Sequence, residues 1–169
     1  MRKVRRNKKG SLQDIILIGA ILLFFGVILL IGSKVTGEWN DAIQARSDIP
    51  ARAKTATATL SGHYGGAMDY GFLLLAIGLG IATLILAALV RIHPVFIPLF
   101  FIGLVFVVFL SAVMSNVYQE MAGNTELTAY ADELIFTSYI LEYLPLVVGI
   151  FGILLMMVMY KLWSVGNES

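Results

Sequence analysis

The chain has 169 residues, of which 59% are hydrophobic and only 14% are charged, and its mean hydropathy is +0.86. Soluble domains carry about 25% charged residues, so this composition excludes a water-soluble globular protein and indicates an integral membrane protein. The absence of cysteine excludes disulfides, thiolate metal sites and a cysteine nucleophile.

Residues 1–14 are predicted to form a basic N-terminal arm. The net charge of the whole chain is only +1, yet the arm holds six of its twelve Lys and Arg residues: Arg2, Lys3, Arg5, Arg6, Lys8 and Lys9. Basic residues beside a span bind anionic headgroups, at roughly 1 kcal/mol each. A dense cationic segment also neutralises nucleic-acid phosphates without reading sequence. Anionic lipid and nucleic acid are therefore both candidate partners of the arm.

Four apolar stretches follow, at about residues 15–32, 70–90, 94–118 and 139–162. Each approaches the roughly 20 apolar residues that a helix needs to cross a bilayer, and none alternates as a lipid-facing strand does. They predict an all-α, integral membrane four-helix bundle over residues 15–163, with a short tail at 164–169. The linker "RIHP" is short, which predicts a tight hairpin of the second and third helices.

The two loops between these spans on the outer side are predicted to contain short helices. In the first, "GEWNDAIQAR" is expected to extend the first helix, and "SDIP" to end it and start another. "SGHYGGAM" is then expected to be a flexible return. In the second loop, one short helix is expected around "ELTAYADEL".

The distribution of basic residues predicts the orientation. The arm, Arg91 and Lys161 lie on one side of a four-span chain, whereas residues 119–137 contain four acidic residues and no basic one. The positive-inside bias therefore places both termini in the cytoplasm or a virion interior.

The first apolar run can be read as an anchor or as a leader. It is as long as a full span and no Ala-x-Ala site follows, so we expect an anchor and not a cleaved signal peptide. The segment "KKGSLQD" resembles the class III leader of archaeal pilin-like proteins, which implies cleavage after Gly10. Pilins of that kind have one span and a soluble domain, whereas this chain has three more spans. We therefore expect Gly10 to stay uncut.

The order of "GSLQDI", "EWNDAIQ", "HPVF" and "LPLVVGIFG" loosely resembles uncharacterised small four-span membrane proteins of archaea, bacteria and their membrane-containing viruses. The resemblance implies a structural or accessory role in a membrane, in some cases as a virion component. It brings no catalytic motif.

Polar residues are few in and near the spans. Asp14 and Asp69 are expected in the first turns of helices one and two, where a carboxylate complements the helix dipole. Glu142 is expected just inside the outer boundary of the fourth span, in the headgroup layer or lining a wet cleft. Ser111 and Ser115 lie four residues apart and are expected to form interhelical hydrogen bonds.

Small residues at helical spacing predict close helix packing. They are Ala76, Gly78, Gly80 and Ala82 on the second helix, and Gly149 and Gly152 on the fourth. The second helix has two such faces, one more than a single neighbour needs. We therefore expect self-association through this helix, with Gly80 at the contact, because Gly80 lies mid-span and its neighbours Ala76 and Gly78 are also small.

We expect a non-enzymatic structural or assembly protein, for example a virion membrane component, with no cofactor and no metal. The sequence contains no nucleophile–base pair, phosphate loop or zinc-ligand spacing. A holin-like pore former and an accessory subunit of a larger membrane complex remain alternatives. The spans lack the polar stripe that usually lines a pore, and no inverted repeat indicates a transporter.

Overall fold

The computed structural model describes the backbone of residues 11–88 and 97–165, and the side chains of residues 15–88 and 97–161. The described backbone is helical apart from short connections and contains no strand, which confirms the predicted all-α fold. The helices are α1 (Ser11–Ala45), α2 (Ala51–Ala88), α3 (Ile97–Ala122), α4 (Thr128–Glu133), α5 (Ile135–Glu142) and α6 (Leu144–Val165).

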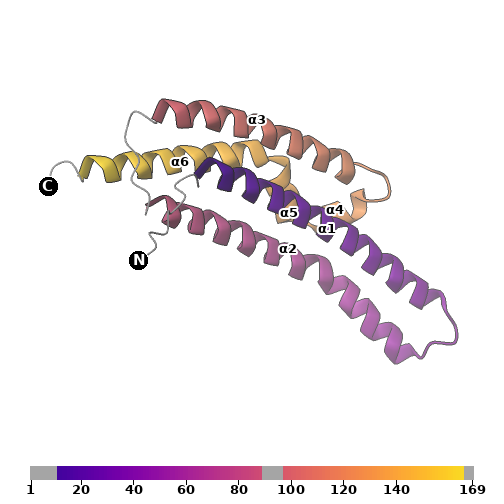
Figure 1. Cartoon of the computed structure of the whole chain (residues 1–169). Coiled ribbons are helices and arrows are strands. Elements are labelled where there is room, and N and C mark those ends of the chain that lie inside the picture. The colour runs from indigo at the N-terminus through magenta and orange to yellow at the C-terminus, as the bar shows by residue number, and fades with distance from the viewer. Residues whose placement is uncertain (1–10, 89–96, 166–169) are drawn as a thin grey trace, which may run out of the picture.

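The helices α1, α2, α3 and α6 are each long and apolar enough to cross a membrane. In Figure 1, α1 and α2 run side by side and extend past α3 and α6 at one end of the bundle. The start of α1, the end of α2, the start of α3 and the end of α6 all lie at the opposite end. This arrangement is that of a multi-pass membrane protein with four crossings.

The four long helices close into a ring of neighbours. α1 packs against α2 and α3, and α6 packs against the same two helices, so α2 and α3 lie at opposite corners. The predicted pairing of the second and third helices is therefore wrong as a packed hairpin, because α2 turns its buried face to α1 and α6. The linker itself falls in residues 89–96, outside the described residues.

The projecting end is a helical hairpin made by α1 and α2. α1 continues to Ala45 and α2 begins directly after Pro50, as the sequence predicts. The side-chain amide of Gln44 donates to the carbonyl of Lys54, and the Lys54 ammonium donates to the carbonyl of Gln44, both at 2.8 Å. These reciprocal bonds hold the two helices together close to the turn.

The flexible return predicted for residues 61–68 is wrong, because this segment lies inside α2. Glycine is a poor helix former, but tertiary contacts support the helix here. The Tyr64 hydroxyl lies 2.6 Å from where a Cβ would stand on Gly32, and a Glu133 oxygen lies 3.0 Å from that position on Gly65. The glycines thus let side chains of other helices approach closely.

The fourth span, predicted as one helix over 139–162, is broken. α5 ends at Glu142 and α6 starts at Leu144. Pro145 explains the break, since it has no N–H and its ring crowds the carbonyl four residues earlier. The short helix predicted in the loop before it is present as α4.

The core lies where the long helices meet α5. Its fully buried apolar side chains are Leu30, Phe72, Tyr118, Leu134, Leu141, Leu144 and Leu155. Many large apolar side chains point outward instead, including Phe24 and Leu74, each 71% exposed. An apolar exterior of this extent needs lipid around it.

Candidate functional site

Apart from those near the α1–α2 turn, the polar side-chain contacts that join different helices gather at the end of the bundle where α4 and α5 lie. The central one is a capping interaction between two helices. Asp69, in the middle of α2, is only 3% exposed. Its carboxylate accepts hydrogen bonds from the backbone N–H groups of Phe136 (2.8 Å) and Thr137 (2.7 Å), and from the Thr137 hydroxyl (2.8 Å).

Phe136 and Thr137 lie in the first turn of α5, whose own N-cap residue, Leu134, provides no side-chain hydrogen bond. Asp69 therefore satisfies amides that a helix start leaves unpaired and places negative charge at the positive end of the α5 dipole. The sequence placed Asp69 in the first turn of its own helix. The structure places it well inside α2, where it caps a different helix.

α1 is tied to the α4 region by charged contacts. The Lys34 ammonium lies 2.5 Å from a Glu126 carboxylate oxygen and 3.6 Å from Glu38. The Ser33 hydroxyl donates to Glu133 at 3.4 Å. The hydrogen bond from Lys34 holds the pKa of the exposed Glu126 carboxyl below its ordinary value of 4.5. These contacts link one end of α4, and the loop before it, to α1.

The two serines of α3 behave differently. Ser115 donates to the backbone carbonyl of Glu142 at 2.5 Å and so joins α3 to α5. Ser111 donates within its own helix, to the carbonyl of Val108 at 2.8 Å, and makes no interhelical bond. The Glu142 carboxylate is exposed at the end of α5 and not inside the fourth span, because the helix breaks at Tyr143.

Several of the predicted small residues lie at helix contacts. A Cβ on Gly80 would stand 2.6 Å from Cζ of Phe151 in α6, and one on Gly152 would overlap the Leu104 side chain of α3. Gly149 faces Val108 at ordinary contact distance, and Ala76 packs against the core. These residues therefore serve packing within one chain, and the expectation that Gly80 forms a contact between copies is wrong, because the Phe151 side chain occupies that side of the helix.

Gly78 and Ala82 lie on another face of α2. A Cβ on Gly78 would meet no atom within 4 Å, and Ala82 is exposed. Gly71, seven residues before Gly78, is equally open. These three residues define the outer face of α2, which has no neighbour among the described residues.

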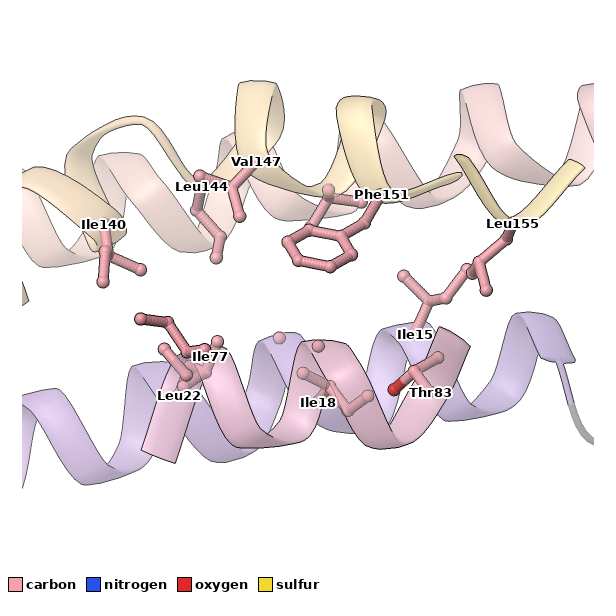
Figure 2. A pocket seen from close by; sticks show the side chains of 14 residues that line it. Ile15, Ile18, Leu22, Ile77, Thr83, Ile140, Leu144, Val147, Phe151 and Leu155 are labelled. Atoms are coloured by element: carbon pink, nitrogen blue, oxygen red, sulfur yellow. The ribbon is translucent and has the colours of Figure 1, made fainter. Parts of the chain in front are cut away.

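An apolar cavity of about 150 Å³ lies between α1, α2, α5 and α6. In Figure 2 the Phe151 ring points from α6 toward α1 and α2 across this space. Its walls are apolar except for Thr83, whose hydroxyl donates to the carbonyl of Leu79 in its own helix. The cavity therefore offers apolar contact and no polar group that is free to bind or react.

The described residues contain no group of three or more His, Asp or Glu side chains that could hold a metal ion. The basic residues predicted to contact lipid or nucleic acid, from Arg2 to Lys9, and the side chain of Asp14 lie outside the described part of the chain.

Thr137, Glu126 and Glu133 were not singled out from the sequence. An acidic loop without a basic residue, facing a loop that contains Lys34, was a signal for the Glu126 contact. No sequence signal linked Thr137 to Asp69, because the two are 68 residues apart.

No protein-family model, curated protein or solved structure matches the chain. Its function is therefore inferred from the contacts and exposed faces described above.

Proposed function

We propose that this chain is a non-enzymatic structural membrane protein that associates with copies of itself through the outer face of α2. The observation that carries the proposal is the open space at Gly78, where an added Cβ would meet no atom within 4 Å. Gly71 and Ala82 lie on the same face, seven residues before Gly78 and four after it. Helices associate in lipid through such close backbone approach, since no hydrophobic drive acts between them.

The interior of the bundle supports a scaffold role over a conduit. The described cavity between the long helices is walled by apolar side chains. The buried polar side chains near the outer end, such as Asp69 and Thr137, are hydrogen-bonded within the protein. A polar path across the membrane would need such groups along its whole length.

The same proposal includes a role for the basic arm and a virion membrane as the place where the protein acts. Six basic residues beside the first span would hold anionic headgroups or nucleic-acid phosphates on the inner side of the membrane. The virion membrane is the setting that the sequence resemblance implies.

Substitution on the outer face of α2 tests self-association. Gly78→Leu should insert normally and keep the stability of the monomer, but it should lose most chemically crosslinked oligomers in native membranes. Val105→Leu is the matched control, because Val105 is 56% exposed on α3, away from α2. Oligomers that survive Gly78→Leu unchanged would exclude the outer face as the contact. A timed loss of membrane integrity after induced expression would favour a pore former instead.

A further inference from the structure

A second, polar cleft lies at the outer end of the bundle, bounded by the end of α3, by α4 and by α5. Its volume is about 350 Å³. Asp132 of α4 and Glu142 of α5 line it together with Tyr118, Gln119, Ser138 and Tyr139. It is separate from the apolar cavity and plays no part in the self-association proposed above.

Three neutral polar side chains of the cleft, those of Tyr118, Gln119 and Ser138, are engaged within the protein. The Ser138 hydroxyl donates to the carbonyl of Ala131 at 3.0 Å, so the Tyr118 hydroxyl, 2.9 Å away, donates to Ser138. The Gln119 amide donates to the Ser115 hydroxyl at 3.1 Å. These three groups form a fixed wall and leave the two carboxylates and Tyr139 to bind a ligand.

The carboxylates of Asp132 and Glu142 are exposed, and neither forms an ion pair with another described residue. Among the described residues that line the cleft, none is basic. The negative charge of the cleft is therefore uncompensated within the described structure, and the cleft favours a cation.

The shape and the aromatic wall favour an organic cation over a metal ion. Calcium takes six to eight oxygen ligands at about 2.3–2.6 Å, and a 350 Å³ cleft with two carboxylates does not surround an ion in that way. Tyr139 is 62% exposed at the cleft, and its ring is stacked against that of Tyr143 with centroids 6.3 Å apart. A phenol face attracts an alkylammonium group through the negative face of its ring quadrupole.

The cleft lies at the level of the lipid headgroups. Tyr118 lies at the end of the uncharged run of α3, and Glu120 is the first charged residue after it. We propose that the cleft binds an alkylammonium group, held by the carboxylates of Asp132 and Glu142 and by the Tyr139 ring. A phospholipid headgroup or a soluble organic cation can present this group.

Tetramethylammonium is the probe for the binding group itself. The full chain in a neutral detergent should bind it saturably by isothermal titration calorimetry. The double variant Asp132→Asn with Glu142→Gln should weaken binding by roughly two- to thirtyfold, since two exposed charge contacts are lost. Tyr139→Leu should also weaken it while both charges remain.

Glu120→Gln is the matched control, because it removes an exposed carboxylate outside the cleft. The lipid that stays bound to the protein from nanodiscs of mixed phosphatidylcholine and phosphatidylglycerol is then identified. It distinguishes a phospholipid headgroup from a soluble organic cation as the source of the alkylammonium group. Enrichment of phosphatidylcholine on the protein, lost in the double variant, assigns a headgroup. Saturable tetramethylammonium binding without enrichment assigns a soluble cation. No saturable binding by the unmodified chain, or equal weakening by Glu120→Gln, would overturn the proposal.

Discussion

The carboxylate of Asp69 and the backbone N–H of Thr137 are 2.7 Å apart, although the two residues are 68 positions apart in the chain. One side chain of α2 thereby completes the first turn of α5. α5 also packs against α1, α2 and α3, and Ser115 of α3 bonds its last carbonyl. The short helix is thus held at both ends by the long helices around it.

Removal of the Asp69 carboxylate should destabilise the protein. Asp69→Ala leaves the buried Thr137 amide, the half-buried Phe136 amide and the Thr137 hydroxyl without their partner, so the free energy of unfolding should fall by about 1–3 kcal/mol. Asp69→Asn keeps one acceptor oxygen and should lose less. Denaturation in mixed micelles measures both, with the exposed Asp41→Ala as control. An Asp69→Ala variant as stable as the unmodified protein would show that the cap contributes nothing.

Two glycines two residues apart in α2 should respond in opposite ways to the same substitution. Gly80→Ala places a Cβ 2.6 Å from the Phe151 ring, and overpacking of this kind costs about 1–3 kcal/mol. Gly78→Ala meets no atom within 4 Å and should be neutral or slightly stabilising, because alanine is the better helix former. Unfolding of the two variants in detergent measures the difference.

Phe151→Leu should partly rescue Gly80→Ala by making room for the new methyl group. The double variant should then be more stable than the sum of the two single effects predicts. Strict additivity would mean that the Gly80–Phe151 contact does not limit how closely α2 and α6 approach.

The Lys34–Glu126 contact should make the α4 end of the bundle sensitive to acid. Lys34 holds the pKa of Glu126 below its ordinary value of 4.5, so the folded state binds this proton less readily than the unfolded state does. The stabilisation is therefore present above pH 4.5 and is lost as the pH falls further through the lowered pKa. The effect should be small, because the Glu126 carboxylate is exposed.

Glu126→Gln should abolish this part of the acid sensitivity, while Glu120→Gln should leave it unchanged. Hydrogen exchange of the α4 amides across the acidic range measures the loss of order. Equal acid sensitivity in the Glu126→Gln variant would assign the effect to another group.

Both ends of the chain should lie on the inner side of the membrane. Reporters fused after Ser169 and inserted in the turn at residues 46–49 should report opposite compartments, because that turn lies at the far end of the α1–α2 hairpin (Figure 1). Excess basic residues beside the first span should place Ser169 inside. Two reporters in one compartment would contradict four crossings.

The sequence by itself determined the class of the protein and its four crossings. Backbone groups in hydrocarbon must be hydrogen-bonded within the protein, which leaves helices or closed barrels, and these runs are too long and lack the alternation of barrel strands. It also determined the restart of α2 after Pro50, because proline and polar caps act locally. The break at Tyr143 has its local cause in Pro145, although the apolar run over 139–162 predicts one span.

Only the tertiary structure decided which residues meet. Ala76, Gly78, Gly80 and Ala82 look equivalent in the sequence, yet Gly80 packs against Phe151 and Gly78 has no neighbour. The reason is that these spans are apolar on every side, so no polar face marks how each helix is rotated. The partner of Asp69 was hidden for the same reason, because it depends on how α5 sits against α2 and not on any local pattern.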